Sequence, residues 1–438
     1  MRKGILSLEA IHFQTSGFFE ELKKAFEESW AENGSVHNYK EAIESASAKK
    51  ILEIIKRHTN LTMVYSTRYP DNGPAIIPAS IRPDHVFHNE QLRKDSEFLS
   101  YFSTFAQKSK NKVLTGSVDL KNAKVHGFFA EEVNELLLPT DFLCRGSFYG
   151  TRMTPGEAAA VVLHEVGHGF TFMEFVTRIN SANQVLAYLS DRRLNTTPDH
   201  YQVVVANVSK AFGLTKEQQA ALEKAKDDKE TAVLLLAMND EKTRSELGVS
   251  MYDSVSAEQL ADQFATRFGA GPDLIEILDR VGGLEVWRNR TRYGWVIDAF
   301  LVAVCGLAIT VPGGVGLLGC YYLILFTLNV AFTGSFGDTY DNAEHRPARV
   351  MQDMVEKLKD KELTSDERKS LIEAVENLQK LIETKKEFPD FAQYVALLLK
   401  SSYRKSYNYE ILQKQLEAIA SNHLFVKSAK LRTIAETI

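Results

Sequence analysis

Apolar and polar residues recur with a helical period in the first sixty residues of the chain. One amphipathic helix is expected at about residues 17–32, where the stop signal Asn33-Gly34 follows, and a second at about residues 39–57. The first 38 residues are therefore predicted to form an N-terminal helical segment, and a larger domain is predicted to begin at residue 39.

The period changes to two after residue 60, and this alternation predicts β-strands. The expected strands lie at residues 61–65, 75–78, 112–119, 123–130 and 133–138. We interpret residues 134–139 as a candidate sheet edge, whose unpaired backbone groups could hold an extended peptide by strand addition. An ordinary sheet edge covered by a loop is an equally good interpretation.

Helical spacing returns at residue 154 and extends through most of the next hundred residues. Separate helices are expected at residues 154–170, 170–178, 183–194, 201–212, 216–225 and 229–238. We interpret residues 176–253 as a helical insertion that packs around the element at 154–170. Another helix is predicted from residue 257, because Ser256 and Gln259 form a capping-box pattern.

The most hydrophobic part of the chain covers residues 295–334. Its second half, residues 315–333, is an apolar run of about 19 residues, enough to cross a hydrocarbon core of about 30 Å. A two-helix membrane hairpin is one interpretation, and arginines at positions 288, 290 and 292 favour a cytoplasmic start. A buried helical hairpin or an oligomer interface is the alternative, because Asp298 and Asn329 lie within the segment.

The C-terminal residues 335–438 are rich in lysine and glutamate and return to helical spacing. One helix is predicted to start at Ser365, with Thr364 and Glu367 as a capping pair. The order of elements predicts an α+β fold with a mixed sheet, large helical insertions and a helical C-terminal region. The predicted parts are residues 1–38, 39–294, 295–334 and 335–438.

The composition narrows the class of function and the compartment. The chain has 438 residues, 44% of them hydrophobic, and its formal net charge of −5 gives no indication of nucleic-acid binding. Three cysteines, at positions 144, 305 and 320, are too few for a disulfide framework and favour a reducing compartment. The N-terminus lacks the apolar run of a secretory signal. We expect a cytoplasmic or membrane-associated protein.

One short motif carries the strongest chemical signal. His164 and His168 frame the sequence His-Glu-Val-Gly-His, and on a helix this spacing puts both imidazoles within reach of one metal ion. Glu165 is then placed to accept a proton from a water activated by the metal. Thr-Pro-Gly-Glu at residues 154–157 is typical of a capped helix start. The alternative is a helix with one solvated and one core histidine.

A third ligand is expected on the helix predicted from residue 257. Glu258 and Asp262 are one turn apart, so both lie on one face. Glu258 is the candidate third ligand of a tetrahedral zinc ion that keeps its fourth position open, and Asp262 is the candidate acceptor for the other N–H of a ligating histidine. The small Ala261 and Ala265 allow close helix approach. A solvent-facing acidic pair is the alternative.

This combination of H-E-x-x-H with a distant E-x-x-A-D helix resembles the gluzincin zinc metallopeptidases, especially the HtpX-like and CAAX prenyl endopeptidase group. The matching residues are His164, Glu165, His168, Glu258, Ala261 and Asp262. The resemblance implies a zincin-like mixed sheet packed on the motif helix, zinc held by the two histidines and the later glutamate, and Glu165 as the catalytic base. It also implies that the strand at 134–139 is the substrate-edge strand. It covers roughly residues 39–269, and only the two helices are specific.

The related peptidases carry a segment with histidine and arginine near their site at a comparable place in chain order. The resemblance therefore makes His345 and Arg349 candidates for stabilising an oxyanion or orienting the metal ligands. The alternative for these residues is an ordinary charged helix start.

The predicted function is that of a zinc-dependent endopeptidase with a protein or peptide substrate. A structural or assembly protein that retains a zinc-bound zincin fold with little turnover is one alternative. An intact Glu165 favours catalysis over this alternative, because a structural zinc ion does not need it. The other alternative is a membrane-anchored interaction protein that acts through the apolar segment 295–334, which would contact a membrane or be buried in an oligomer.

Overall fold

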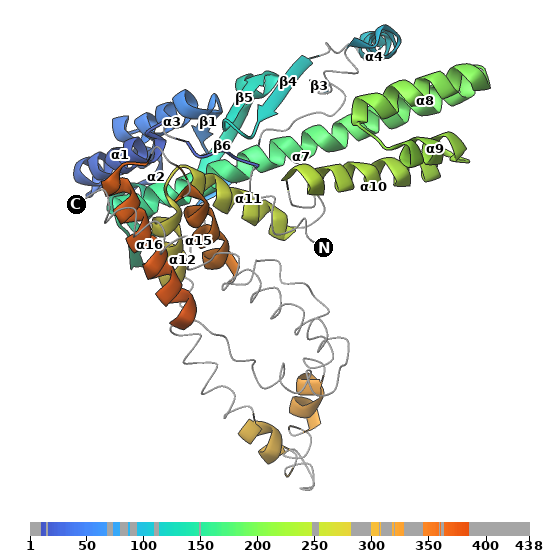
Figure 1. Ribbon diagram of the computed structural model, residues 1–438. Helices are drawn as coiled ribbons and strands as arrows, with labels where there is room; N and C mark the ends of the chain where they lie inside the picture. The colour runs from blue at the N-terminus through green and yellow to red at the C-terminus, as the bar shows by residue number, and fades with distance from the viewer. Residues whose placement is uncertain are drawn as a thin grey trace. The chain divides into compact units, whose positions relative to one another are not determined.

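The computed structural model is mostly helical and contains three small β-sheets (Figure 1), so the predicted mixed α+β class is confirmed at this level. The chain divides into two compact units, Met1–Leu274 and Ile275–Ile438. The predicted boundaries after residues 38, 294 and 334 stay predictions. The structure describes residues 10–14, 16–67, 73–78, 86–87, 94–108, 114–148, 150–247, 254–281, 299–305, 307, 318, 320–327, 345–358, 360 and 363–384.

The first unit begins with helices, as predicted. Helix α1 (Phe18–Asn33) packs against α3 and α7 and ends next to Gly34. The single helix predicted at residues 39–57 is wrong, because the structure has α2 (Tyr39–Glu44) and α3 (Ala46–Thr59) instead. Ser45 separates them: its backbone is extended, and its hydroxyl accepts a hydrogen bond from the N–H of Ala48. Serine favours such a cap over a helix interior.

One mixed sheet lies beside the motif helix. It consists of β1 (Thr62–Tyr65), β6 (Val133–Leu137) and β2 (Ala75–Ile77) in the order β1-β6-β2. β6 is parallel to β1 and antiparallel to β2. The prediction that residues 134–139 form a sheet edge is therefore wrong: β6 is the central strand, and β2 lies at an edge in the described part of the chain. Alternation in a sequence predicts a strand but not its neighbours.

A second sheet has the order β3 (Val86–Phe87), β4 (Leu114–Asp119) and β5 (Lys124–Gly127). The strand predicted at residues 123–130 is shorter than expected, because Gly127, with φ +62°, turns the chain into the short helix α5 (Phe128–Glu131). Helix α6 (Thr140–Arg145) and the hairpin of β7 (Ser147–Phe148) with β8 (Thr151–Arg152) lead into the motif helix.

The motif helix α7 (Pro155–Asn195) is 41 residues long. It begins as predicted: the Thr154 hydroxyl accepts from the N–H of Glu157, and the Glu157 carboxylate accepts from the N–H of Thr154. The separate helices predicted at residues 170–178 and 183–194 are wrong, because α7 is continuous through both. No glycine or proline lies between residues 170 and 195 to interrupt it.

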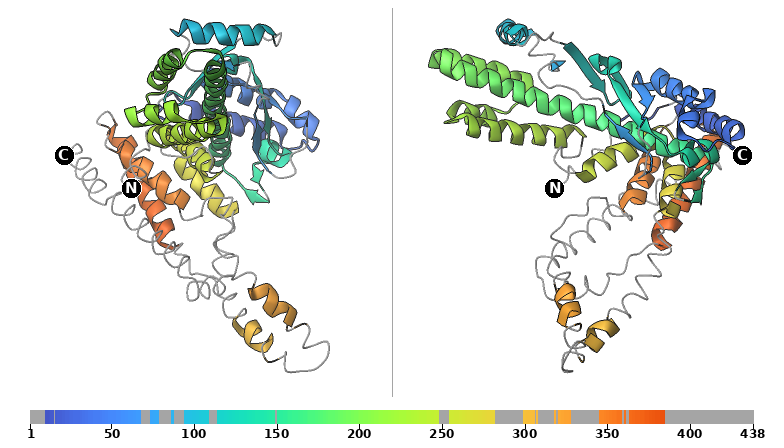
Figure 2. Two further views of the ribbon diagram at one scale, coloured as in Figure 1. Left: turned by 90° about the vertical axis from the view of Figure 1, so that its right-hand side faces the viewer. Right: turned by 180° about the vertical axis from the view of Figure 1, so that it is seen from behind.

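The second half of α7 forms a helical arm with α8 (Pro198–Phe212), α9 (Lys216–Lys224), α10 (Asp228–Leu247) and α4 (Ser96–Lys108), which was not predicted (Figure 2). These five helices share one apolar core. α10 runs beyond the predicted end at residue 238. The predicted insertion is thus a helical bundle built on the motif helix, which α4 joins from an earlier part of the chain.

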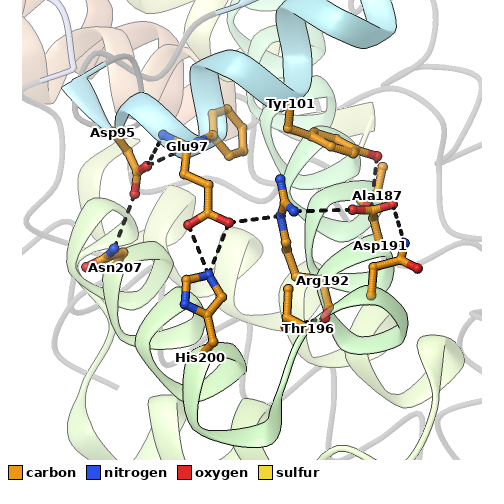
Figure 3. A network of polar contacts seen from close by, with 11 residues as sticks. Asp95, Glu97, Tyr101, Ala187, Asp191, Arg192, Thr196, His200 and Asn207 are labelled. Carbon is orange, nitrogen blue, oxygen red and sulfur yellow. Dashed lines mark hydrogen bonds and ion pairs between the residues drawn. The ribbon is translucent and has the colours of Figure 1, made fainter.

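A polar network attaches α4 to the arm (Figure 3). The Glu97 carboxylate of α4 pairs with Arg192 Nε at 3.1 Å and with His200 Nε2 at 3.2 Å. The Arg192 guanidinium also lies over the rings of Tyr101 and Tyr188, 5.6 Å and 5.2 Å from their centroids. Because α4 precedes the motif in the chain, these contacts join segments that are about 100 residues apart in the sequence.

Helix α11 (Ser254–Arg267) is buried on all sides from Leu260 to Arg267 and is followed by α12 (Gly271–Val281). The predicted start at residue 257 is wrong, since the helix begins at Ser254 and Ser256 lies inside it. Polar residues of the kind that cap helices precede both residue 254 and residue 257 in the sequence. Sequence patterns leave helix ends uncertain by a few residues.

In the second unit, α15 (His345–Lys357) and α16 (Ser365–Thr384) share an apolar core. The predicted start at Ser365 is confirmed: the Thr364 hydroxyl accepts from the N–H of Glu367. Residues 299–305, 307, 318 and 320–327 are helical, while the rest of the predicted apolar hairpin and residues 385–438 lie outside the described residues. Among the described helices, none combines the length and apolarity needed to cross a membrane.

Candidate metal centre

Two helices far apart in the sequence, α7 and α11, cross at the motif. A methyl group on Gly167 of α7 would lie 2.8 Å from the Cα atom of Ala261 and 2.9 Å from the Cβ atom of Phe264, both on α11. Such distances are shorter than carbon–carbon contacts in folded proteins. The glycine therefore lets the two backbones approach closely, and this approach brings side chains of α11 within reach of the motif histidines.

His164 and His168 direct the same ring nitrogen to one point. Their Nε2 atoms are 3.1 Å apart, and the rings meet edge to face with centroids 4.6 Å apart. His164 is buried and His168 is partly exposed. With both Nε2 atoms unprotonated, two lone pairs would face each other, so the arrangement suits either a hydrogen bond between the rings or a cation held by both.

Glu258 of α11 completes the cluster. Its Oε2 atom lies 3.5 Å from His164 Nε2, and its Oε1 atom lies 3.4 Å from His168 Nε2. Ligand atoms about 2.1 Å from a tetrahedral ion are about 3.4 Å apart. The separations are close to that spacing, although the two histidines are nearest to different oxygens of Glu258, and one ligand atom from each residue lies within 4.8 Å of the others. His164, His168 and Glu258 together could hold one metal ion.

The electrostatic surroundings keep Glu258 in its charged form. Burial alone would raise the pKa of its carboxyl group. Hydrogen bonds and the positive charge of His164 and His168 outweigh burial and hold this pKa well below its usual range. An anionic oxygen ligand is therefore available at neutral pH.

Asp262 supports the first histidine from the opposite side of its ring. It is 2% exposed, and its Oδ1 atom lies 3.0 Å from Nδ1 of His164. A carboxylate in this position accepts the Nδ1–H, which leaves the lone pair of Nε2 directed at the cluster. The 3.0 Å contact is compatible with the role expected of Asp262, and that role stays a prediction.

Glu165 lies beside the cluster and beside the sheet. Burial raises the pKa of its carboxyl group, and the two histidines and a backbone hydrogen bond from Ile76 of β2 act in the opposite direction. A raised pKa brings a carboxyl group closer to the pH range in which it can both accept and release a proton. Glu165 therefore has the surroundings of a proton-transfer group, next to the edge strand β2.

The two remaining candidates lie in the second unit. His345 is the first residue of α15, and Arg349 is partly exposed one turn later. Their role at an oxyanion or a metal ligand stays a prediction.

Sequence reasoning missed two residues that shape the site. Gly167 sets the approach of α7 and α11, and its signal is a glycine in a helix interior, which costs about 1 kcal/mol relative to alanine and so indicates a packing requirement. Ile76 provides the backbone hydrogen bond to Glu165. Nothing in the sequence around Ile76 indicates this contact, because it depends on where β2 lies in the sheet.

The resemblance to gluzincin peptidases rests on six residues of α7 and α11, and the structure brings these two helices together at the motif. Comparison with family models, with curated proteins and with solved structures gives no match to this chain. Family membership and the zincin-like fold stay predictions.

Proposed function

We propose that this chain is a zinc-dependent endopeptidase of zincin-like fold. The observation that carries the proposal is the cluster itself: His164, His168 and Glu258 converge with ligand spacing, and a proton-transfer carboxyl group, Glu165, lies beside them. A structural metal site usually has four protein ligands, whereas a catalytic site has three and an open position. The three ligands and the adjacent base support a catalytic site.

Zinc is the metal we propose for the cluster. Two imidazole nitrogens and one carboxylate oxygen are a donor set typical of catalytic zinc, and thiolate ligands are absent from the cluster in the described part of the chain. When bound, a zinc ion supplies Lewis acidity, which lowers the pKa of water and polarises a peptide carbonyl group.

The side chains then divide the work of hydrolysis. A carboxylate oxygen of Glu165 accepts the proton that the attacking water loses and later donates it to the leaving amine. Asp262 holds the Nδ1–H of His164, so this ring keeps its orientation throughout. No proton is left on Glu165 at the end, and the base is ready for another turnover.

A protein or peptide is the substrate class that best suits the neighbouring strand. β2 lies at an edge of its sheet in the described part of the chain, and its residue Ile76 hydrogen-bonds to Glu165. An edge strand holds extended peptides through backbone hydrogen bonds. A peptide paired with β2 would have its backbone next to the proton-transfer group. In this proposal β2, rather than the strand predicted at residues 134–139, is the edge strand that holds the peptide.

The proposal is tested by metal analysis and one conservative substitution. We expect purified protein to contain about one zinc ion per chain. Glu165→Gln should retain the metal and lose about 10²–10⁴-fold of peptide hydrolysis, because the amide cannot accept a proton. Glu246→Gln, an exposed change on α10, is the matched control and should behave like wild type.

Wild type without bound metal would contradict the proposal. Bound zinc with equal proteolysis in wild type and Glu165→Gln would instead favour a structural protein that retains the zinc site.

The apolar segment 295–334 supports a second candidate function, contact with a membrane. Large apolar side chains are exposed in its described part: Phe300, Val304, Leu307, Leu318, Tyr321, Ile324 and Leu325. Exposed apolar groups of this density usually mark an interaction surface. We expect the full chain to float with neutral lipid vesicles and Ile324→Asp to float less. Flotation unaffected by Ile324→Asp, or a stable oligomer without flotation, would favour burial between copies.

A further inference from the structure

The motif helix carries an apolar stripe that continues from the candidate site. Successive helix residues rotate by about 100°, so residues 7, 11 and 14 positions after Glu165 return to within about 40° of its direction. These residues are Phe172, Val176 and Ile179. His168 lies on the same side, one turn before Phe172. The face with the proton-transfer group therefore continues as an apolar surface, which we call the α7 stripe.

The α7 stripe is not part of the protein core. Phe172 is 38% exposed, and Val176 and Ile179 are partly exposed. Apolar residues on other sides of the same turns behave differently, since Phe170 and Met173 are completely buried. An aromatic ring left partly accessible one turn from a candidate metal ligand requires a reason, because full burial of a phenylalanine side chain stabilises a fold by about 1.5–3 kcal/mol and Phe172 forgoes part of that.

The charged side of the same turns faces inward. Glu174 and Arg178 form an ion pair at 2.7 Å with side chains only 12% and 15% exposed. Arg178 also donates to Thr243 at 3.2 Å and pairs with Glu246 at 2.8 Å, both on α10. A surface helix normally buries its apolar side and exposes its charges. At these turns α7 departs from this pattern in part: the ion pair packs against α10, and the α7 stripe on the opposite side stays partly exposed, while Phe170 and Met173 are buried.

We propose that the α7 stripe binds apolar side chains of the substrate, in an extended segment that lies on one side of the cleaved bond. The proposal rests on the proposed function and adds a substrate class to it. From Glu165 to Ile179 the helix rises about 21 Å, the length of about six extended residues. The continuity of the stripe with Glu165 and His168 identifies the substrate, rather than another partner, as the occupant.

The test uses two pools of quenched fluorescent dodecapeptides with a randomised central pair. One pool carries leucine, valine and phenylalanine around this pair, the other serine, asparagine and glutamine, and both end in the same lysines. Wild type should cleave the apolar pool with a kcat/KM about tenfold higher or more. Phe172→Ser should remove most of this preference through KM, because the contact holds ground state and transition state alike.

Leu194→Ser is the matched control. Leu194 is also an exposed apolar residue of α7, at 81% exposure, but lies at the far end of the helix. It should retain the wild-type preference. Phe172→Trp should retain the preference as well, and all three variants should keep the wild-type zinc content and helicity. Equal cleavage of both pools by wild type, or an unchanged preference in Phe172→Ser, would overturn the inference while the proposed function stands.

A binding measurement separates the two proposals. In the Glu165→Gln background, fluorescence anisotropy should show tighter binding of the apolar pool, and addition of Phe172→Ser should abolish the difference. If this result is obtained but wild type cleaves neither pool, the proposed function fails and the stripe remains an apolar peptide site. If Phe172→Ser instead changes the oligomeric state, or binding to neutral vesicles, with no effect on peptides, another copy or a lipid surface covers the stripe and the inference fails.

Discussion

The buried carboxylate of Asp262 lies against Nδ1 of His164, and in the proposed site it sets which nitrogen of this ring faces the metal. Its Oδ1 atom is 3.0 Å from Nδ1, and the side chain is nearly inaccessible to water. A buried carboxylate requires hydrogen-bond donors, and the imidazole N–H is one. If Asp262 accepts the Nδ1–H of His164, the unprotonated Nε2 atom of the same ring faces His168 and Glu258. In the proposed site, Asp262 therefore sets both the orientation of this ring and the basicity of its Nε2 atom.

We predict that Asp262→Ala lowers zinc affinity about 10–100-fold, the usual cost of losing a carboxylate behind a ligating histidine. Asp262→Asn keeps an acceptor but not the charge, so its loss should be smaller. Competition with a fluorescent zinc chelator measures both. Asp240→Ala removes an acidic residue of α10 that pairs with Arg244, and it should leave the affinity unchanged. Wild-type affinity in Asp262→Ala would contradict the assigned contact.

At the scale of elements, the site depends on how closely α7 and α11 cross. Gly167 lies over Ala261, and Phe170 of α7 stacks on Phe264 of α11 with ring centroids 5.1 Å apart. The glycine allows the short distance between the two helix backbones, and the aromatic pair provides apolar contact between the helices. Glu258 reaches both histidines only because both conditions hold. The crossing of α7 and α11 therefore positions all three candidate metal ligands.

Gly167→Ala should weaken the site although alanine favours helices. In a free helix this change stabilises by about 1 kcal/mol. Here the methyl group would meet backbone atoms of α11, so we expect a net loss of about 1–2 kcal/mol from overpacking and weaker zinc binding. Thermal unfolding and chelator competition measure the two effects.

Gly169→Ala is the matched control, two residues further along α7. Its methyl group would meet only the end of the Ile76 side chain, which can move. A larger loss for Gly169→Ala than for Gly167→Ala would contradict the assigned role of the crossing.

At the scale of the molecule, the candidate site lies in the first unit, where α1, α10 and β2 also pack on α7. The helix crossing is held by apolar packing and by the pair of Asp262 with His164, neither of which needs a metal ion. The fold of this unit should therefore persist without metal. Metal binding should add stability by mass action, since it favours the folded state.

Chelation should lower the thermal midpoint without loss of helicity at 25 °C. At a free zinc concentration about 1,000 times Kd, the added stability is about 4 kcal/mol. Circular dichroism at 222 nm during chelation and re-addition of zinc, with thermal scans in both states, measures the effect. Loss of helicity on chelation would show that the metal is needed for folding. Glu258→Ala, which lacks one ligand, should show a smaller shift of the midpoint.

The sequence by itself determined the features that depend on neighbouring residues. Helical spacing placed two histidines and a glutamate on α7, the capping box fixed the start of that helix, and the spacing of Glu258 and Asp262 put both on one face of α11. These follow from local geometry, because side chains three or four residues apart in a helix are neighbours.

Only the tertiary structure decided what depends on contacts between distant segments. In the described part of the chain it made β6 the central strand of the first sheet, with β1 and β2 at the edges, since pairing partners are not encoded in the alternation of one strand. It also packed the ion pair of Glu174 and Arg178 against α10 and left Phe172 partly exposed on the opposite side of α7. The candidate ligands could be read from the sequence, whereas the surfaces around them could not, because these arise where distant segments pack.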